Sequence, residues 1–140
     1  MKSFLKRRLR CLSSGRVWVG YWIALFVATH VPDTGTGTMG VDHADKVVHV
    51  AMYYLLVWLG GRYLYPGLGR GLPCPNAART LWVWAAVYCA YGGADEWLQQ
   101  FVSRTPSLGD WVADSAGIIG ATLWLTWSRP TRRLSEPGGG

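Results

Sequence analysis

The chain has few charged residues and few cysteines, and it lacks the short motifs that identify several common enzyme classes. Only 16% of its 140 residues are charged, and its three cysteines are Cys11, Cys74 and Cys89. No two of them are spaced as Cys-x-x-Cys, so neither a thiolate zinc site nor covalently attached haem is expected, and no disulfide framework is implied. There is no Ser-x-x-Lys, no His-Glu-x-x-His and no glycine-rich phosphate loop. The corresponding catalytic mechanisms are therefore disfavoured.

Apolar and aromatic residues are abundant instead. Half of the residues are apolar, and nine are tryptophans. Membrane proteins place tryptophan at the headgroup boundary, whereas a soluble domain of this size rarely carries so many. The net charge of +6 comes from basic residues that flank apolar segments rather than from a basic recognition patch, so nucleic acid is not an expected partner.

Four apolar stretches follow one another along the chain, and each approaches the length of about 17–25 residues that a membrane-crossing helix needs. The third continues with helical character through Phe101. Four such spans with their connections leave no room for a separate soluble domain in a chain of 140 residues. The four predicted spans cover Val17–Val31, Val47–Tyr65, Thr80–Ala94 and Trp111–Trp127.

The charges are divided between the two sides of this predicted membrane protein. Twelve of the fourteen Lys and Arg residues flank one side, and seven of the eight Asp and Glu residues lie on the other. Basic loops stay in the cytoplasm, so both termini are predicted to be cytoplasmic. The twelve cations on that side are Lys2, Lys6, Arg7, Arg8, Arg10, Arg16, Arg62, Arg70, Arg79, Arg129, Arg132 and Arg133.

We therefore predict an all-α, polytopic membrane protein with a four-helix bundle. A basic cytoplasmic tail would cover residues 1–15, the membrane domain 16–128 and a second cytoplasmic tail 129–140. An alternative is a cleaved signal peptide, because a basic start precedes a fifteen-residue apolar run. The small-x-small cleavage pattern is poor, since its last position is His30. Cleavage would place the new N-terminus outside.

Polar residues gather near the external ends of three predicted spans. Residues four apart share one face of a helix, and acids, amides and a histidine recur at that spacing. Ionisable groups at such a depth usually face a partner, a cavity or water. The pairs are Asp45 with His49, Asp95 with Gln99, and Asp110 with Asp114, while Glu96 and Gln100 lie one residue round from the second pair.

Each of these residues also has a purely structural interpretation. Asp45 and Asp110 suit the first turn of a helix, where an acid complements the dipole. His49 could be a histidine of the core, and Glu96 with Gln99 could join helices by hydrogen bonds. Four glycines are expected to let helices approach closely: Gly92, Gly93, Gly117 and Gly120.

Three ordered blocks give the chain a family resemblance. They are Asp45-Lys46-x-x-His49, then Asp95-Glu96-x-x-Gln99 followed by Phe101, and then Arg104-x-x-Ser107-x-x-Asp110-x-x-x-Asp114-x-x-Gly117. With this set, spread over residues 17–127, the chain resembles the VanZ-like family of small bacterial membrane proteins. Family members usually carry Asn where this chain has Asp114, and Gly where it has Ser103.

The resemblance implies an integral protein of the bacterial inner membrane and cell envelope. The founding member of the family is associated with low-level resistance to the glycopeptide antibiotic teicoplanin. Family membership supplies neither a reaction nor a cofactor. Membrane lipid is the expected partner, with a lipid-linked envelope intermediate or a glycopeptide as further candidates.

Two functions are compatible with the polar residues. The first is an outer-face site that binds a lipid headgroup, a lipid-linked sugar or a lipophilic glycopeptide; Arg104 and Lys46 would hold phosphate or carboxylate, and Gln99 and Ser107 would orient it. The expected binding set is Asp45, Lys46, His49, Asp95, Glu96, Gln99, Arg104, Ser107, Asp110 and Asp114.

The second function is an enzyme, a hydrolase or transferase that acts on such a headgroup. Glu96 or His49 would be its general base, Asp45 would orient the base, and Arg104 would stabilise developing negative charge. A purely structural alternative makes Arg104 the counter-ion of Glu96 or Asp110. A divalent metal is a variant of this hypothesis, with Asp45, His49, Glu96 and Asp114 as candidate ligands. A haem held by two histidines is disfavoured, because His30 and His49 lie at outer helix ends.

Overall fold

The chain folds entirely into α-helices wherever its structure is described. A computed structural model describes residues 2–31, 42–65, 76–102 and 104–128, with side chains from residue 15 in the first range and 45 in the second. These ranges contain four α-helices, one short 3-10 helix and no strand, which confirms the all-α prediction. The helices are α1 (Lys2–Thr29), α2 (Asp42–Leu64), α3 (Ala77–Gln99) and α4 (Leu108–Trp127), and η2 is Gln100–Val102.

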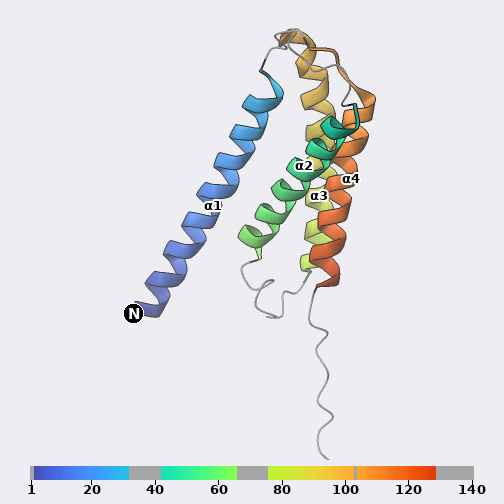
Figure 1. Ribbon diagram of the computed structural model, residues 1–140. Helices are drawn as coiled ribbons and strands as arrows, with labels where there is room; N and C mark the ends of the chain where they lie inside the picture. Colours follow the sequence, from blue (N-terminus) through green and yellow to red (C-terminus); the bar gives the residue numbers. More distant parts are fainter. Residues whose placement is uncertain (1, 32–41, 66–75, 103, 129–140) are drawn as a thin grey trace, which may run out of the picture.

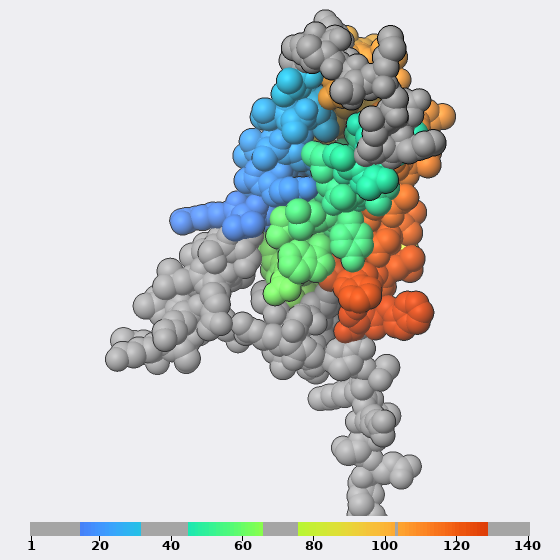
Figure 2. Space-filling view, in the orientation of Figure 1, coloured from blue at the N-terminus to red at the C-terminus, as the bar shows by residue number. Residues whose placement is uncertain are grey.

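The four helices run alternately up and down (Figure 1). As a result, the end of α1, the start of α2, the end of α3 and the start of α4 lie at one end of the molecule. The most extensive helix packing joins α2 to α4, followed by α3 to α4 and α1 to α2. One face shows α1, α2 and α4 side by side (Figure 2).

The helix ends extend beyond the apolar runs. α1 begins at Lys2 rather than at the predicted Val17, because Leu, Lys and Arg are good helix formers and no proline interrupts the basic segment. α4 begins at Leu108, where the Ser107 hydroxyl accepts a hydrogen bond from the backbone N–H of Asp110. Ser107 is therefore the N-cap, and Asp110 lies in the first turn, where its charge complements the helix dipole.

The core is aromatic and aliphatic along most of the bundle. Leu25, Tyr53, Leu56, Tyr88 and Ile118 are almost completely buried. One of the predicted close approaches is very tight, since a Cβ added at Gly117 of α4 would lie 2.3 Å from the backbone oxygen of Val50 in α2. Only glycine permits this contact between the two backbones. The prediction that Gly117 brings helices together is confirmed.

The outer surface of the described helices is strongly apolar. Large hydrophobic side chains are exposed on all four, among them Val17, Ile23, Val47, Leu55, Val83, Val87, Val112, Ile119, Leu123 and Trp124. One helix, over residues 45–64, is long and apolar enough to cross a membrane by length and composition alone, and the apolar part of α1, Gly15–Thr29, is shorter. The fold thus contains one helix that meets this criterion, within the described ranges.

Candidate functional site

The ten predicted site residues lie at the end of the bundle where α2 and α4 begin and α3 ends (Figure 1). The up-and-down order of the helices produces this gathering, since it brings three widely separated sequence blocks to one end.

A buried histidine–carboxylate pair joins α2 to α4. His49 Nδ1 lies 2.9 Å from Asp114 Oδ1, and the two side chains are 11% and 2% exposed. An ionised carboxylate can only accept hydrogen bonds, so Nδ1 is the donor. The sequence predicted that Asp45 would orient His49, but the hydrogen-bond partner is Asp114, because α4 packs closely along α2.

The carboxylate of Glu96 accepts two hydrogen bonds, one from a backbone N–H and one from a side-chain amide. Its Oε2 accepts from the backbone N–H of Ser107 at 2.9 Å, and its Oε1 accepts from Gln99 Nε2 at 3.2 Å. Glu96 and Gln99 are 6% and 4% exposed. Both carboxylate oxygens are thus engaged, and Glu96 ties the connection after α3 to the last turn of that helix.

Arg104 contacts the first helix rather than an acid. Its Nη1 donates to the backbone oxygen of Thr29 at 3.0 Å, a carbonyl at the end of α1 that has no partner within its own helix. No ion pair joins Arg104 to Glu96 or to Asp110 within the described part of the chain. The counter-ion role suggested for Arg104 is therefore not formed here; its guanidinium closes the C-terminus of α1.

The more accessible part of the cluster is formed by Asp45, Lys46 and Asp110. Asp45 is exposed. Lys46 Nζ lies 3.7 Å from Asp110 Oδ1, with side chains 47% and 17% exposed. An ion pair of this length and exposure contributes little to stability, so the lysine can move away without disrupting the fold.

A second histidine–carboxylate contact connects α1 to α3, and the sequence interpretation missed it. His30 Nδ1 lies 3.6 Å from Asp95 Oδ1, and Asp95 is 2% exposed. Asp95 therefore faces α1, while Glu96 faces the connection before α4. The available signal was that His30 lies near the outer end of the first apolar run, on the same predicted side as Asp95, but the sequence does not show which helices are neighbours.

Acids outnumber permanent cations in the cluster. It contains Asp45, Asp95, Glu96, Asp110 and Asp114, against Lys46 and Arg104. Such a site attracts cations, and it can accept a phosphate only if Lys46, Arg104 or an added cation faces that ligand. His30 and His49, the two histidines of the disfavoured haem hypothesis, each face a different carboxylate of the bundle.

No protein-family model matches the chain, and comparisons with curated proteins and with solved structures also give no match.

Proposed function

We propose that all four helices of the chain cross a bacterial inner membrane, with both termini in the cytoplasm and the polar cluster at the outer face. The observation that carries this proposal is the distribution of polarity. Asp95 and Asp114 are each 2% exposed, whereas large apolar side chains are exposed on the described part of each helix. Soluble monomers rarely expose so much apolar surface, while intramembrane acids typically face the bundle interior.

This distribution also explains how α3 and α4 can lie in a membrane although only the helix over residues 45–64 meets the length-and-composition criterion within the described ranges. Asp95, Glu96 and Asp114 lower the average apolarity of their helices, yet all three are buried against other helices. The polarity of a lipid-facing surface depends only on the residues that point outward from the bundle. The outward residues of these two helices, such as Val87 and Leu123, are apolar.

The polar end supports recognition of a lipid headgroup, a lipid-linked sugar or a lipophilic glycopeptide, in line with the VanZ-like resemblance. Lys46 is exposed and Arg104 is half-buried, and we infer that both lie where an anionic group of a membrane lipid would reach the bundle. Gln99 and Ser107 hold Glu96, so their contribution is to fix the shape of the site. Binding at this end is the function that the geometry supports best.

An enzyme that acts on the same headgroup is the second candidate, and the His49–Asp114 contact favours it. A histidine whose Nδ1–H is held by a buried carboxylate has a fixed tautomer, with its other nitrogen free to accept a proton. Asp114 is then the orienting residue. Turnover of a lipid-linked substrate by the purified protein would replace the binding proposal with this one.

Topology can be tested by cysteine labelling. Single cysteines at Thr36 and Gly138, introduced after Cys11, Cys74 and Cys89 are replaced by serine, should react with a membrane-impermeant maleimide from opposite sides. We expect Thr36→Cys to be labelled in intact spheroplasts and Gly138→Cys only after lysis. The reverse pattern would place the polar cluster in the cytoplasm and overturn the proposal.

Near-isosteric substitutions separate function from folding. Glu96→Gln, Asp45→Asn and Arg104→Lys should each leave thermal stability in detergent almost unchanged, because shape and most packing are retained. Each should abolish the phenotype of the intact gene, measured as teicoplanin sensitivity or envelope lipid composition. Arg104→Lys keeps the charge but loses the planar fork. Full phenotype in all three variants would mean that the cluster only joins helices.

A further inference from the structure

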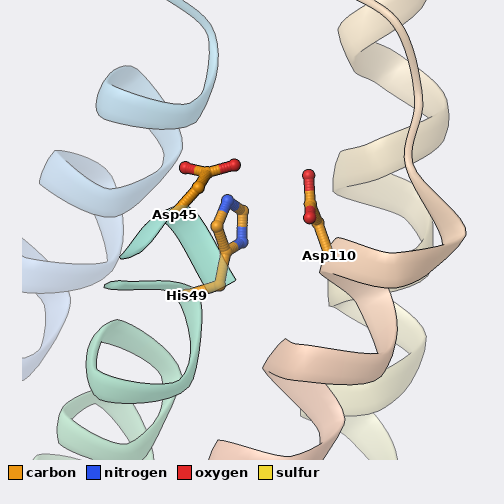
Figure 3. A group of neighbouring side chains, drawn as sticks. All are labelled: Asp45, His49 and Asp110. Atoms are coloured by element: carbon orange, nitrogen blue, oxygen red, sulfur yellow. The ribbon is translucent and has the colours of Figure 1, made fainter. Parts of the chain in front are cut away.

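Three potential metal ligands from two helices meet at the accessible edge of the polar cluster. Asp45 and His49 come from the first turns of α2, and Asp110 comes from the first turn of α4. One ligand atom from each lies within 4.8 Å of the other two. In Figure 3 the imidazole of His49 rises toward the carboxylate of Asp45, and the carboxylate of Asp110 faces both from the neighbouring helix.

The histidine is already oriented for coordination. His49 Nδ1 donates to Asp114 Oδ1 at 2.9 Å, which leaves the lone pair on Nε2, the ring nitrogen on the opposite side. Metal-binding histidines almost always donate their other N–H to a carboxylate, carbonyl or water in this way. Asp114, at 2% exposure, thus has the position of a carboxylate that supports a ligand rather than of a ligand.

One buried oxygen of this group lacks a hydrogen bond, and one ring nitrogen has no partner among the described residues. His49 is only 9% exposed, and none of the described residues gives its Nε2 a hydrogen-bond partner. Asp110 Oδ1 is also buried without a hydrogen bond, and its nearest cation is Lys46 Nζ at 3.7 Å. Buried polar atoms normally have partners, so the unpaired oxygen of Asp110, which lies beside the oriented imidazole of His49, points to a bound cation.

A rival group consists of His49, Glu96 and Asp114, whose ligand atoms are equally close. The ligand atoms of this group already form hydrogen bonds with one another or with neighbouring residues. Both oxygens of Glu96 accept hydrogen bonds, and His49 Nδ1 is bonded to Asp114 Oδ1. A metal there would have to break these bonds, whereas Asp45, His49 Nε2 and Asp110 have no such bonds among the described residues.

We propose that Asp45, His49 and Asp110 bind one divalent transition-metal ion, with Asp114 holding the histidine. One imidazole nitrogen and two carboxylate oxygens suit Zn²⁺ better than Mg²⁺ or Ca²⁺, which prefer oxygen ligands. Three protein ligands leave a position open, and the exposed side chain of Asp45 gives access to it. This inference goes beyond headgroup recognition and holds whether or not a lipid binds.

The test uses the full-length chain, purified in detergent, freed of any affinity tag and stripped with a chelator. Titration with ZnCl₂ in a calorimeter should show one ion per chain, and Co²⁺ should give a visible absorption spectrum typical of mixed nitrogen and oxygen ligands. Asp45→Asn and Asp110→Asn should each weaken Zn²⁺ binding at least 10-fold. Asp114→Asn should weaken it about 10- to 100-fold, as found for supporting carboxylates. Glu96→Gln should bind normally.

Two further variants keep the test decisive. Lys46→Gln should tighten binding several-fold, because it removes the ammonium group that competes for Asp110; a lysine with a purely structural role would not do so. The double variant His30→Gln/His43→Gln should bind normally, which excludes attachment to the other histidines. Melting curves without metal must show that each variant is folded.

Three results would overturn the inference. The first is absence of Zn²⁺ binding at millimolar metal. The second is loss of binding in Glu96→Gln with normal binding in Asp110→Asn, which would assign the ion to the rival group. The third is loss of binding in the His30→Gln/His43→Gln variant alone. None of these results would bear on whether the polar end binds a headgroup, which the phenotype of Arg104→Lys tests separately.

Discussion

Gly117→Ala should destabilise the protein by about 3 kcal/mol or prevent its folding, the largest effect expected for the addition of one methyl group. The new Cβ would lie 2.3 Å from the backbone oxygen of Val50. A backbone atom cannot rotate away as a side chain can, so α2 and α4 would have to separate along their whole contact. Overpacking usually costs about 1–3 kcal/mol, and contacts with rigid atoms lie at the upper end.

Gly20→Ala is the matched control. Gly20 also lies inside a helix, and a Cβ added there meets no atom within 4 Å. Alanine is a better helix former than glycine by about 1 kcal/mol, so this variant should be as stable as the parent or slightly more stable. Unfolding of both variants can be followed by circular dichroism in detergent. Equal stability of the two would show that α2 and α4 are not in close backbone contact.

Asp114→Ala should destabilise the protein by about 3–5 kcal/mol, because it removes one partner of a buried, charge-assisted hydrogen bond and leaves His49 unpaired. Asp114 and its Oδ1 contact with His49 Nδ1 are both buried between α2 and α4. Denaturant titration in detergent would measure the change. The same loss would be expected for His49→Ala if the two residues act as a unit.

The double variant His49→Leu/Asp114→Leu provides the sharper comparison. Replacing both members of a buried polar pair by apolar residues is often neutral or stabilising, so the double variant should recover most of the stability lost in Asp114→Ala. It should still lack Zn²⁺ binding and any phenotype of the gene. If the double variant were as unstable as the single one, the pair would not be the source of the loss.

The sequence alone was sufficient to predict the helices. Apolar runs of nearly constant length and the scarcity of proline within them predict four helices, and the structure contains four within its described ranges. The spacing of Asp45 with His49 and of Asp110 with Asp114 also predicted that these residues begin two helices. Local spacing determines such features, because a helix is built from contacts between residues three or four positions apart.

The partners within the site were decided by tertiary structure. Asp45 is four residues from His49, yet the carboxylate bonded to this histidine is Asp114, 65 residues away. Arg104 donates a hydrogen bond to the backbone oxygen of Thr29 in α1. Apart from the position of His30, nothing in the sequence indicated that this helix contacts the site. Which faces meet depends on the rotation and separation of packed helices, and the contact at Gly117 sets the separation of α2 and α4. Sequence spacing carries no information on that geometry.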